Sequence, residues 1–310
     1  MSLPFRTFVR NFSTSGLKKN AIKNVTIIGG GLMGAGIAQV AASTGHSVVM
    51  VDQNTDILNK SKANIEKSLQ RVVKKKYAED PKAGEAFLSQ VLGNLALETD
   101  AATSVKKADL VIEAIVENLK IKQELFKNLD MAAPASTIFA SNTSSIPIKE
   151  IAVATERADR FGGLHYFNPV PMMKLLEVIR IPQTSDETFD KLLAFGKAMG
   201  KVTVNCKDTP GFIVNRLLVP YMMEAVRMVE RGEATPKDVD TAMKLGAGYP
   251  MGPFELTDYV GLDTCKFIID GWHEKYPDHP LFAPSPLLNK YVAEGKLGNK
   301  VGEGFYKSKK

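Results

Sequence analysis

The segment Gly29-Gly30-Gly31-Leu32-Met33-Gly34 constrains the fold of this chain more than any other part of its sequence. It follows a β-branched run at residues 25–28 and precedes an expected helix at residues 32–43. Glycines at the first, third and sixth positions permit a tight turn, a close approach of backbone to a pyrophosphate, and close packing of helix on strand. The segment therefore predicts a strand–turn–helix unit that binds a dinucleotide; a glycine turn without a ligand is the alternative.

Asp52 supports the dinucleotide interpretation and indicates which cofactor is bound. It ends a second expected strand at residues 47–52, at about the 20-residue spacing at which an acidic residue accepts the ribose hydroxyls. The residues that follow, 53–55, include no arginine to accommodate a 2′-phosphate. We therefore expect NAD rather than NADP. The predicted cofactor-binding residues are Gly29, Gly30, Gly31, Leu32, Met33, Gly34 and Asp52.

Short β-branched runs alternate with longer helical stretches over residues 22–207. The expected strands are residues 25–28, 47–52, 108–114, 137–141, 161–166, 175–179 and 202–206. The expected helices are residues 32–43, 57–77, 119–131 and 186–199. This alternation is typical of an α/β protein with a Rossmann-like, doubly wound, mostly parallel sheet between two layers of helices. We assign residues 22–207 to such an NAD-binding domain.

The strand pattern stops near Asp208, and residues 208–310 are expected to form an all-helical C-terminal domain. Residues 212–232 are one apolar-periodic stretch, with a kink expected at Pro220. Thr235 and the proline after it are typical of an N-cap followed by the first helical position. A further single helix is expected at residues 254–276, and the apolar faces of these helices predict a homodimer.

Composition excludes several classes of protein. No apolar run approaches the roughly 20 residues that a membrane-spanning helix needs. The two cysteines, Cys206 and Cys265, do not have the spacing of metal ligands or of a redox motif. We therefore expect two buried free thiols, no metal site and no membrane span.

The N-terminus is basic and contains no acidic residue, because the first acid of the chain is Asp52. Residues 1–20 contain four basic residues, Arg6, Arg10, Lys18 and Lys19. An acid-free, arginine-containing, serine-rich N-terminus is typical of a mitochondrial transit peptide, and a basic tail without function is the alternative. Without these four charges the net charge falls from +6 to +2, which argues against nucleic acid as a partner.

Of the four histidines, His165 alone ends an expected strand. Open α/β sheets carry their sites at the carboxyl ends of their strands, although a single histidine at such a place is more often structural. Glu177 favours a catalytic role, because it interrupts the apolar strand 175–179, where a buried carboxylate needs a partner. A glutamate bonded to His165 would fix its tautomer and stabilise the imidazolium that forms when a substrate hydroxyl loses its proton.

Several long segments together resemble one family, the mitochondrial L-3-hydroxyacyl-CoA dehydrogenases. They are Val25–Gly36, Ala114–Asn118, Ser141-Asn142-Thr143-Ser144-Ser145, His165-Tyr166-Phe167-Asn168-Pro169-Val170-Pro171-Met172, Lys207–Leu217 and Gly248–Leu262. The similarity is colinear from about residue 22 to the C-terminus. It implies a Rossmann domain, a helical dimerisation domain that helps close the site, and a location in the mitochondrial matrix. It also implies the β-oxidation step in which (S)-3-hydroxyacyl-CoA and NAD give 3-oxoacyl-CoA and NADH.

The resemblance assigns roles to further residues. His165 is implied as the catalytic base with Glu177 as its partner, and Ser144 and Asn215 are implied to hold the substrate oxygen. Ser144 is also implied to contact the cofactor and CoA. Further implied cofactor contacts are Glu117, Lys122 and Lys300. Without the resemblance, Ser144 would be interpreted as a turn residue and Asn215 as a helix cap.

The basic segment Lys60–Lys76 is the remaining candidate for substrate binding. Such a segment is usually a solvated helix face, but the resemblance implies that Ser68 and Lys75 contact CoA, whose phosphates need cationic partners. Two alternatives remain open at this stage. One is a related NAD dehydrogenase that acts on a free hydroxy acid, and the other is a structural protein that has kept the fold.

Overall fold

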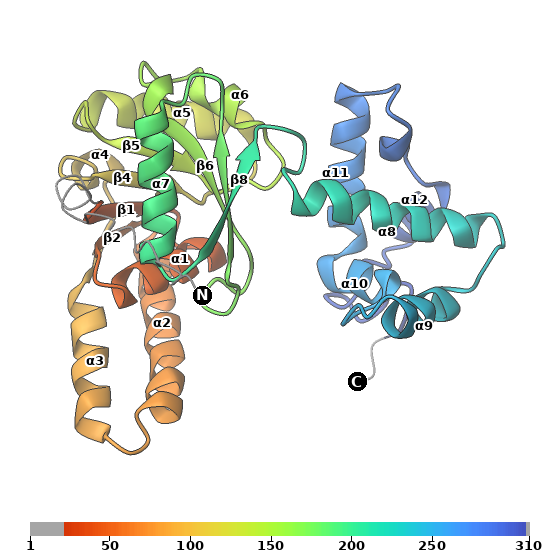
Figure 1. The fold of residues 1–310 in the computed structure, drawn as a ribbon, viewed down its shortest axis with the longest axis horizontal. Helices are drawn as coiled ribbons and strands as arrows, with labels where there is room; N and C mark the ends of the chain where they lie inside the picture. Colours follow the sequence, from red (N-terminus) through yellow and green to blue (C-terminus); the bar gives the residue numbers. More distant parts are fainter. Residues whose placement is uncertain (1–21, 308–310) are drawn as a thin grey trace, which may run out of the picture. The chain divides into compact units, whose positions relative to one another are not determined.

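The structure is a computed structural model that describes residues 22–307. The predicted transit segment, residues 1–20, lies outside the described residues. Among the described residues, 22–208 and 209–307 form two compact units (Figure 1). No helix of the described residues combines the length and the apolar character that crossing a membrane requires.

The first unit contains one eight-stranded sheet with the strand order β3-β2-β1-β4-β5-β6-β7-β8. The strands are β1 (Asn24–Ile28), β2 (Ser47–Val51), β3 (Leu95–Glu98), β4 (Leu110–Glu113), β5 (Ile138–Ser141), β6 (Phe161–Tyr166), β7 (Leu175–Arg180) and β8 (Val202–Lys207). Every neighbouring pair is parallel except β6 and β7. The predicted doubly wound, mostly parallel sheet is therefore confirmed.

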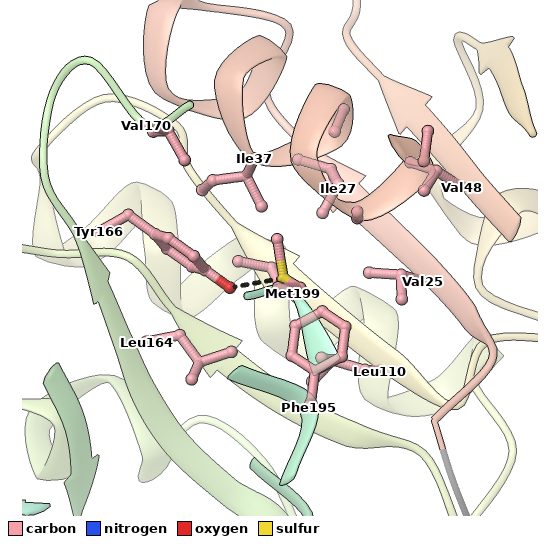
Figure 2. Packing of buried hydrophobic residues seen from close by; sticks show 14 of the residues in the cluster. Val25, Ile27, Ile37, Val48, Leu110, Leu164, Tyr166, Val170, Phe195 and Met199 are labelled. Atoms are coloured by element: carbon pink, nitrogen blue, oxygen red, sulfur yellow. Dashed lines mark hydrogen bonds between the residues drawn. The ribbon is translucent and has the colours of Figure 1, made fainter. Parts of the chain in front are cut away.

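Helices cover both faces of the sheet (Figure 1). They are α1 (Leu32–Ser43), α2 (Thr55–Lys76), α3 (Pro81–Gly93), α4 (Ala101–Ser104), α5 (Leu119–Ala132), α6 (Ile148–Ala152), the 3-10 turn η1 (Ala158–Arg160) and α7 (Asp186–Ala198). Residues of α1 and α7, such as Ile37 and Phe195, pack with Val25 and Leu164 of the sheet in one core cluster (Figure 2). On the other face, Phe126 of α5 packs on aromatic residues of β5 and β6.

Three features of this unit were not expected from the sequence. Helix α3 and the edge strand β3 follow α2 in a part of the chain where no element was expected. Strand β7 is antiparallel to β6, because the connection at residues 167–174 is shorter than the dozen or more residues that a parallel crossover needs. The backbone carbonyls of Val170 and Met173 in that connection accept from the ammonium of Lys201. Because Lys201 directly precedes β8, these bonds hold the turn against that strand.

The described residues of the second unit form helices and no named strand, as expected. Its elements are α8 (Val214–Glu230), α9 (Pro236–Gly246), α10 (Pro253–Val260), α11 (Leu262–Lys275), the 3-10 turn η2 (Pro280–Phe282) and α12 (Pro286–Ala293). Thr235 caps α9 by accepting from Asp238 N, which confirms the predicted start of that helix. The predicted single helix at residues 254–276 is wrong. Gly261, with φ of 103°, ends α10 and begins α11, because a left-handed residue cannot continue a helix.

Candidate active site

His165 and Glu177 face each other across the antiparallel strands β6 and β7. The two residues are register partners, and the Nδ1–Oε2 distance between their side chains is 2.7 Å. The side chains are 6% and 0% exposed. Directly opposed residues of an antiparallel pair hold their Cβ atoms about 5 Å apart, which suits a direct bond between imidazole and carboxylate. The antiparallel turn between β6 and β7 was not predicted from the sequence. It nevertheless brings together His165 and Glu177, the pair that was predicted.

The bond to Glu177 determines how the imidazole of His165 can react. A carboxylate accepts and cannot donate, so neutral His165 carries its proton on Nδ1 and has Nε2 as its basic nitrogen. The ring of Phe167 lies 4.5 Å from the imidazole, centroid to centroid, and restricts its rotation. When Nε2 takes a proton, Glu177 stabilises the charge that forms. The arrangement is suited to general-base chemistry on a hydroxyl.

The glycine loop between β1 and α1 is shaped by close backbone contacts. A Cβ on Gly34 would lie 1.8 Å from Gly29 O, and a Cβ on Gly29 would lie 2.5 Å from Ala114 O. At Gly31, by contrast, a Cβ would meet nothing within 4 Å. Gly31 is also the N-cap of α1 and gives its first turn no side-chain cap. The loop thus leaves open space in front of a helix N-terminus, and it fits a pyrophosphate.

Asp52 lies directly after β2 and joins it to the glycine loop. Its Oδ2 accepts from Gly30 N at 2.8 Å, and its Oδ1 accepts from Asn54 N at 3.3 Å. Each carboxylate oxygen retains a further lone pair with which it can accept from a ribose hydroxyl. Leu32 and Met33 are the first two residues of α1, and the Leu32 side chain is exposed. The seven cofactor-binding residues that were predicted from the glycine segment and Asp52 therefore lie together at the carboxyl ends of β1 and β2.

Glu117 organises the loop that contains Ser144. Its Oε1 accepts from Thr143 Oγ1, Ser145 Oγ and the backbone N–H groups of Ser144 and Ser145, and its Oε2 lies 3.2 Å from Lys122 Nζ. Burial alone would raise the pKa of the Glu117 carboxyl. The Lys122 ammonium and the hydroxyls of Thr143 and Ser145 outweigh burial and hold this pKa below its usual value. Glu117 is therefore ionised at neutral pH, and it fixes the loop through Ser144.

Two residues of this network were missed in the sequence. Glu113, at the end of β4, is fully buried and accepts from Lys122 Nζ, Ile115 N and Ser141 Oγ. The sequence feature that could have identified Glu113 is the same as for Glu177: each is a carboxylate in an otherwise apolar strand. Asn142 follows β5, and its Oδ1 accepts from Tyr166 N at 2.9 Å. This bond ties the loop before Ser144 to the residue after His165.

Ser68 and Lys75 lie on α2 of the same unit. Gln39 Nε2 of α1 donates to Ser68 Oγ at 3.0 Å. Lys75 is exposed in the last turn of α2, together with two further lysines. The two residues are separated along the helix by about two turns, so they belong to one helix but not to one compact cluster.

Asn215 and Lys300 belong to the second unit. Asn215 is the second residue of α8 and is half-buried. Lys300 lies in the C-terminal segment, and its Nζ bonds both carboxylate oxygens of Asp263, at 2.5 and 2.6 Å. The C-terminal segment is itself tied to α10, because the Asp258 carboxylate accepts from Phe305 N and Tyr306 N.

The fold and the site define an NAD-dependent oxidoreductase that acts on a hydroxyl group. The defining features are the Rossmann-type sheet, the glycine loop with an acid at the end of the next strand, and the buried His–Glu pair. Comparison with known families agrees with this class. Residues 24–209 match the NAD binding domain of 3-hydroxyacyl-CoA dehydrogenase, and residues 211–308 match its C-terminal domain. The chain belongs to the 3-hydroxyacyl-CoA dehydrogenase family.

Individual relatives are similar over their full length. The chain is 64% identical to the mitochondrial hydroxyacyl-coenzyme A dehydrogenase of Homo sapiens, over 100% of both chains. It is 59% identical to a probable 3-hydroxyacyl-CoA dehydrogenase of Caenorhabditis elegans, over 97% of each chain. The solved structure of (S)-3-hydroxybutyryl-CoA dehydrogenase from Ralstonia eutropha has a TM-score of 0.88 and 41% identity, covering 94% of this chain and 100% of that one. The mammalian relatives are named as mitochondrial, which indicates a mitochondrial location for this chain.

Proposed function

We propose that this chain oxidises the 3-hydroxyl of an (S)-3-hydroxyacyl-CoA to a ketone, with His165 as the general base. The observation that carries the proposal is the buried His165–Glu177 pair, with Nδ1 and Oε2 2.7 Å apart. A neutral imidazole with a basic Nε2 can take the hydroxyl proton as the carbonyl forms. NAD, when bound, supplies the acceptor for the hydride that leaves the same carbon.

We assign the orientation of the substrate and the movement of its proton to separate residues. Neutral His165 takes the proton on Nε2 and becomes a cation beside Glu177. Ser144 is held in place by Glu117 through the backbone, so its hydroxyl is available to position the substrate oxygen. We assign the same role in the second unit to Asn215, at the first turn of α8. We assign cofactor contacts to Ser144, Glu117, Lys122 and Lys300.

We assign CoA binding to Ser68 and Lys75 of α2. The last turn of that helix carries Lys74, Lys75 and Lys76, all exposed, which is the charge that the phosphates of CoA require. A free hydroxy acid has no phosphate groups for these lysines to bind. A comparison of 3-hydroxybutyryl-CoA with free 3-hydroxybutyrate separates the two substrate classes. We expect NADH formation from the thioester only, and equal rates would favour the free acid.

The decisive experiment for the proposed function is a series of 3-hydroxyacyl-CoAs of graded length, followed by NADH absorbance. Turnover of at least one member is expected with NAD, and His165→Gln should abolish most of it. Turnover of none would leave a protein with the family's fold but without its activity, which is the structural alternative.

We further propose that the enzyme acts in fatty-acid β-oxidation in the mitochondrial matrix. The acid-free N-terminus, residues 1–20, supports import and cleavage near residues 12–22. Sequencing the N-terminus of protein isolated from its source tests this. A new N-terminus in that range is expected, and an intact Met1 in cytosolic material would contradict it.

A further inference from the structure

A buried cluster of charged residues lies between the glycine loop and His165. The strands β1, β4, β5 and β6 are neighbours in that order. The glycine loop follows β1, Glu113 ends β4, Ser141 ends β5, and His165 lies near the end of β6. The loop touches the chain just after Glu113, since a Cβ on Gly29 would lie 3.2 Å from Ile115 N. A dinucleotide that begins at the loop and reaches His165 therefore crosses the ends of β4 and β5.

The cluster contains two carboxylates and one ammonium. Glu113 and Lys122 are 0% and 1% exposed, and Glu117 is 30% exposed. The three groups that bond to the Glu113 side chain, Lys122 Nζ, Ile115 N and Ser141 Oγ, are all donors, which is the hydrogen-bonding environment of a carboxylate. Lys122 lies between the two glutamates, and the cluster as a whole carries one net negative charge.

The negative charge is concentrated on the exposed side of the cluster. Lys122 Nζ lies 2.5 Å from Glu113 Oε1 and 3.2 Å from Glu117 Oε2. The ammonium is therefore drawn toward the buried glutamate and away from the one that solvent reaches. If Glu113 were neutral, Lys122 would compensate Glu117 alone, and the cluster would have no net charge.

The reaction changes the charge of the nicotinamide ring of the cofactor. The nicotinamide ring is a cation in NAD+ and is neutral in NADH. A negative group beside it stabilises the oxidised form and leaves the reduced form almost unaffected. We propose that Glu113 is a positioning residue that pairs with Lys122 and neutralises its charge. The negative charge of Glu117 then remains uncompensated, and it favours binding of NAD+ over binding of NADH. This inference rests on the cofactor site of the proposed function, but not on His165 or the substrate.

The size of the effect follows from Coulomb's law. For unit charges separated by on the order of 10 Å, an effective dielectric constant of about 20 gives a change in affinity of about tenfold. Removing the charge of Glu113 should therefore raise the ratio of the NAD+ to the NADH dissociation constant about tenfold. The effect is largest at low ionic strength, because salt screens charges that solvent reaches.

The test measures the two dissociation constants separately, without turnover. NADH is titrated by its fluorescence and NAD+ by calorimetry, at low salt, with wild type and Glu113→Gln. The amide keeps the shape of the side chain and an oxygen acceptor for Lys122 while removing the charge. A ratio about tenfold higher in the variant is expected. A variant that loses affinity for both forms equally would overturn the proposal, because a merely structural role weakens both.

Two further variants complete the test. Glu117→Gln removes the same charge from the exposed side and should shift the ratio in the same direction, so it decides the question if Glu113→Gln does not fold. Asp130→Asn is the matched control, since Asp130 is a largely buried carboxylate that pairs with Arg157 at the other end of α5. It should lower stability and leave the ratio unchanged. An unchanged ratio in Glu117→Gln overturns the proposal, whereas a wild type that binds neither form refutes the cofactor site instead.

Discussion

Alanine at two positions of the glycine loop should separate folding from cofactor binding. At Gly34 the new Cβ would lie 1.8 Å from Gly29 O, and at Gly31 it would meet nothing within 4 Å. Gly31 has φ of −66°, which any residue adopts, so alanine there strains nothing. Gly34→Ala should therefore damage the fold, whereas Gly31→Ala should leave it intact and occupy the space into which a pyrophosphate would move.

The magnitudes differ accordingly. Overpacking costs about 1–3 kcal/mol, and the upper end applies at Gly34 because the obstacle is backbone and cannot rotate away. At 2–4 °C per kcal/mol for a unit of this size, Gly34→Ala should lower Tm by roughly 6–12 °C. Gly31→Ala should keep Tm within about 2 °C, since it changes stability by under about 0.5 kcal/mol. Its affinity for NAD should fall on the order of tenfold or more, as expected for a lost phosphate contact.

The assay pairs thermal melting with a fluorescence titration of NADH for the wild type and both variants. Gly34→Ala is expected to lose stability, and Gly31→Ala is expected to lose only affinity. A Gly34→Ala protein that melts like the wild type would refute the geometry of the loop. A Gly31→Ala protein that binds NADH like the wild type would refute the placement of the pyrophosphate.

Three further predictions concern the cofactor, the thiols and the quaternary structure. Asp52→Ser should narrow the preference for NAD over NADP in steady-state kinetics, because the carboxylate repels a 2′-phosphate; a wild type that already uses both cofactors would contradict this. Burial raises the pKa of both Cys206 and Cys265 to about 12, so neither should react with iodoacetamide at pH 8 until the protein is unfolded, and labelling of the native protein would count against it. The exposed apolar side chains Leu217 and Phe267 of α8 and α11 are suited to a two-fold interface, so sedimentation should give a dimer and Phe267→Glu a weaker one, whereas a monomeric wild type at micromolar concentration would exclude the homodimer.

The sheet could be predicted because its signals are local. The glycine loop, the acid after β2 and the buried β-branched runs each specify their own element, and the parallel core follows from their alternation. Strand β3 could not be predicted in this way, because Leu95–Glu98 has mixed burial at a sheet edge, whereas the equally short β4 and β5 are buried throughout. The single helix expected at residues 254–276 failed because the apolar pattern continues across Gly261, where the backbone turns.

Some residues of the candidate site could be identified singly from the sequence, but the hydrogen-bond network that joins them could not. Glu177 attracted attention as a carboxylate in an apolar strand, and the antiparallel register explains its bond to His165. Glu113 has the same kind of signal in β4, yet its partner Lys122 lies on the following helix, which no strand pattern indicates. Contacts between separate elements, such as the bond from Tyr166 N to Asn142 Oδ1, depend on how the elements are placed in space, so they could not be predicted from the sequence.

The most direct test of the account is a double-mutant cycle on kcat for His165 and Glu177, with a 3-hydroxyacyl-CoA as substrate. General-base catalysis contributes about 10²–10⁴-fold, so His165→Gln should lower kcat by that order while NADH still binds. Glu177→Gln should lower kcat as well, because a neutral amide stabilises an imidazolium less than a carboxylate does. If the two residues act as one unit, the double variant is little slower than His165→Gln alone. Losses that multiply fully would show two independent side chains and would contradict the pair on which the proposed mechanism rests.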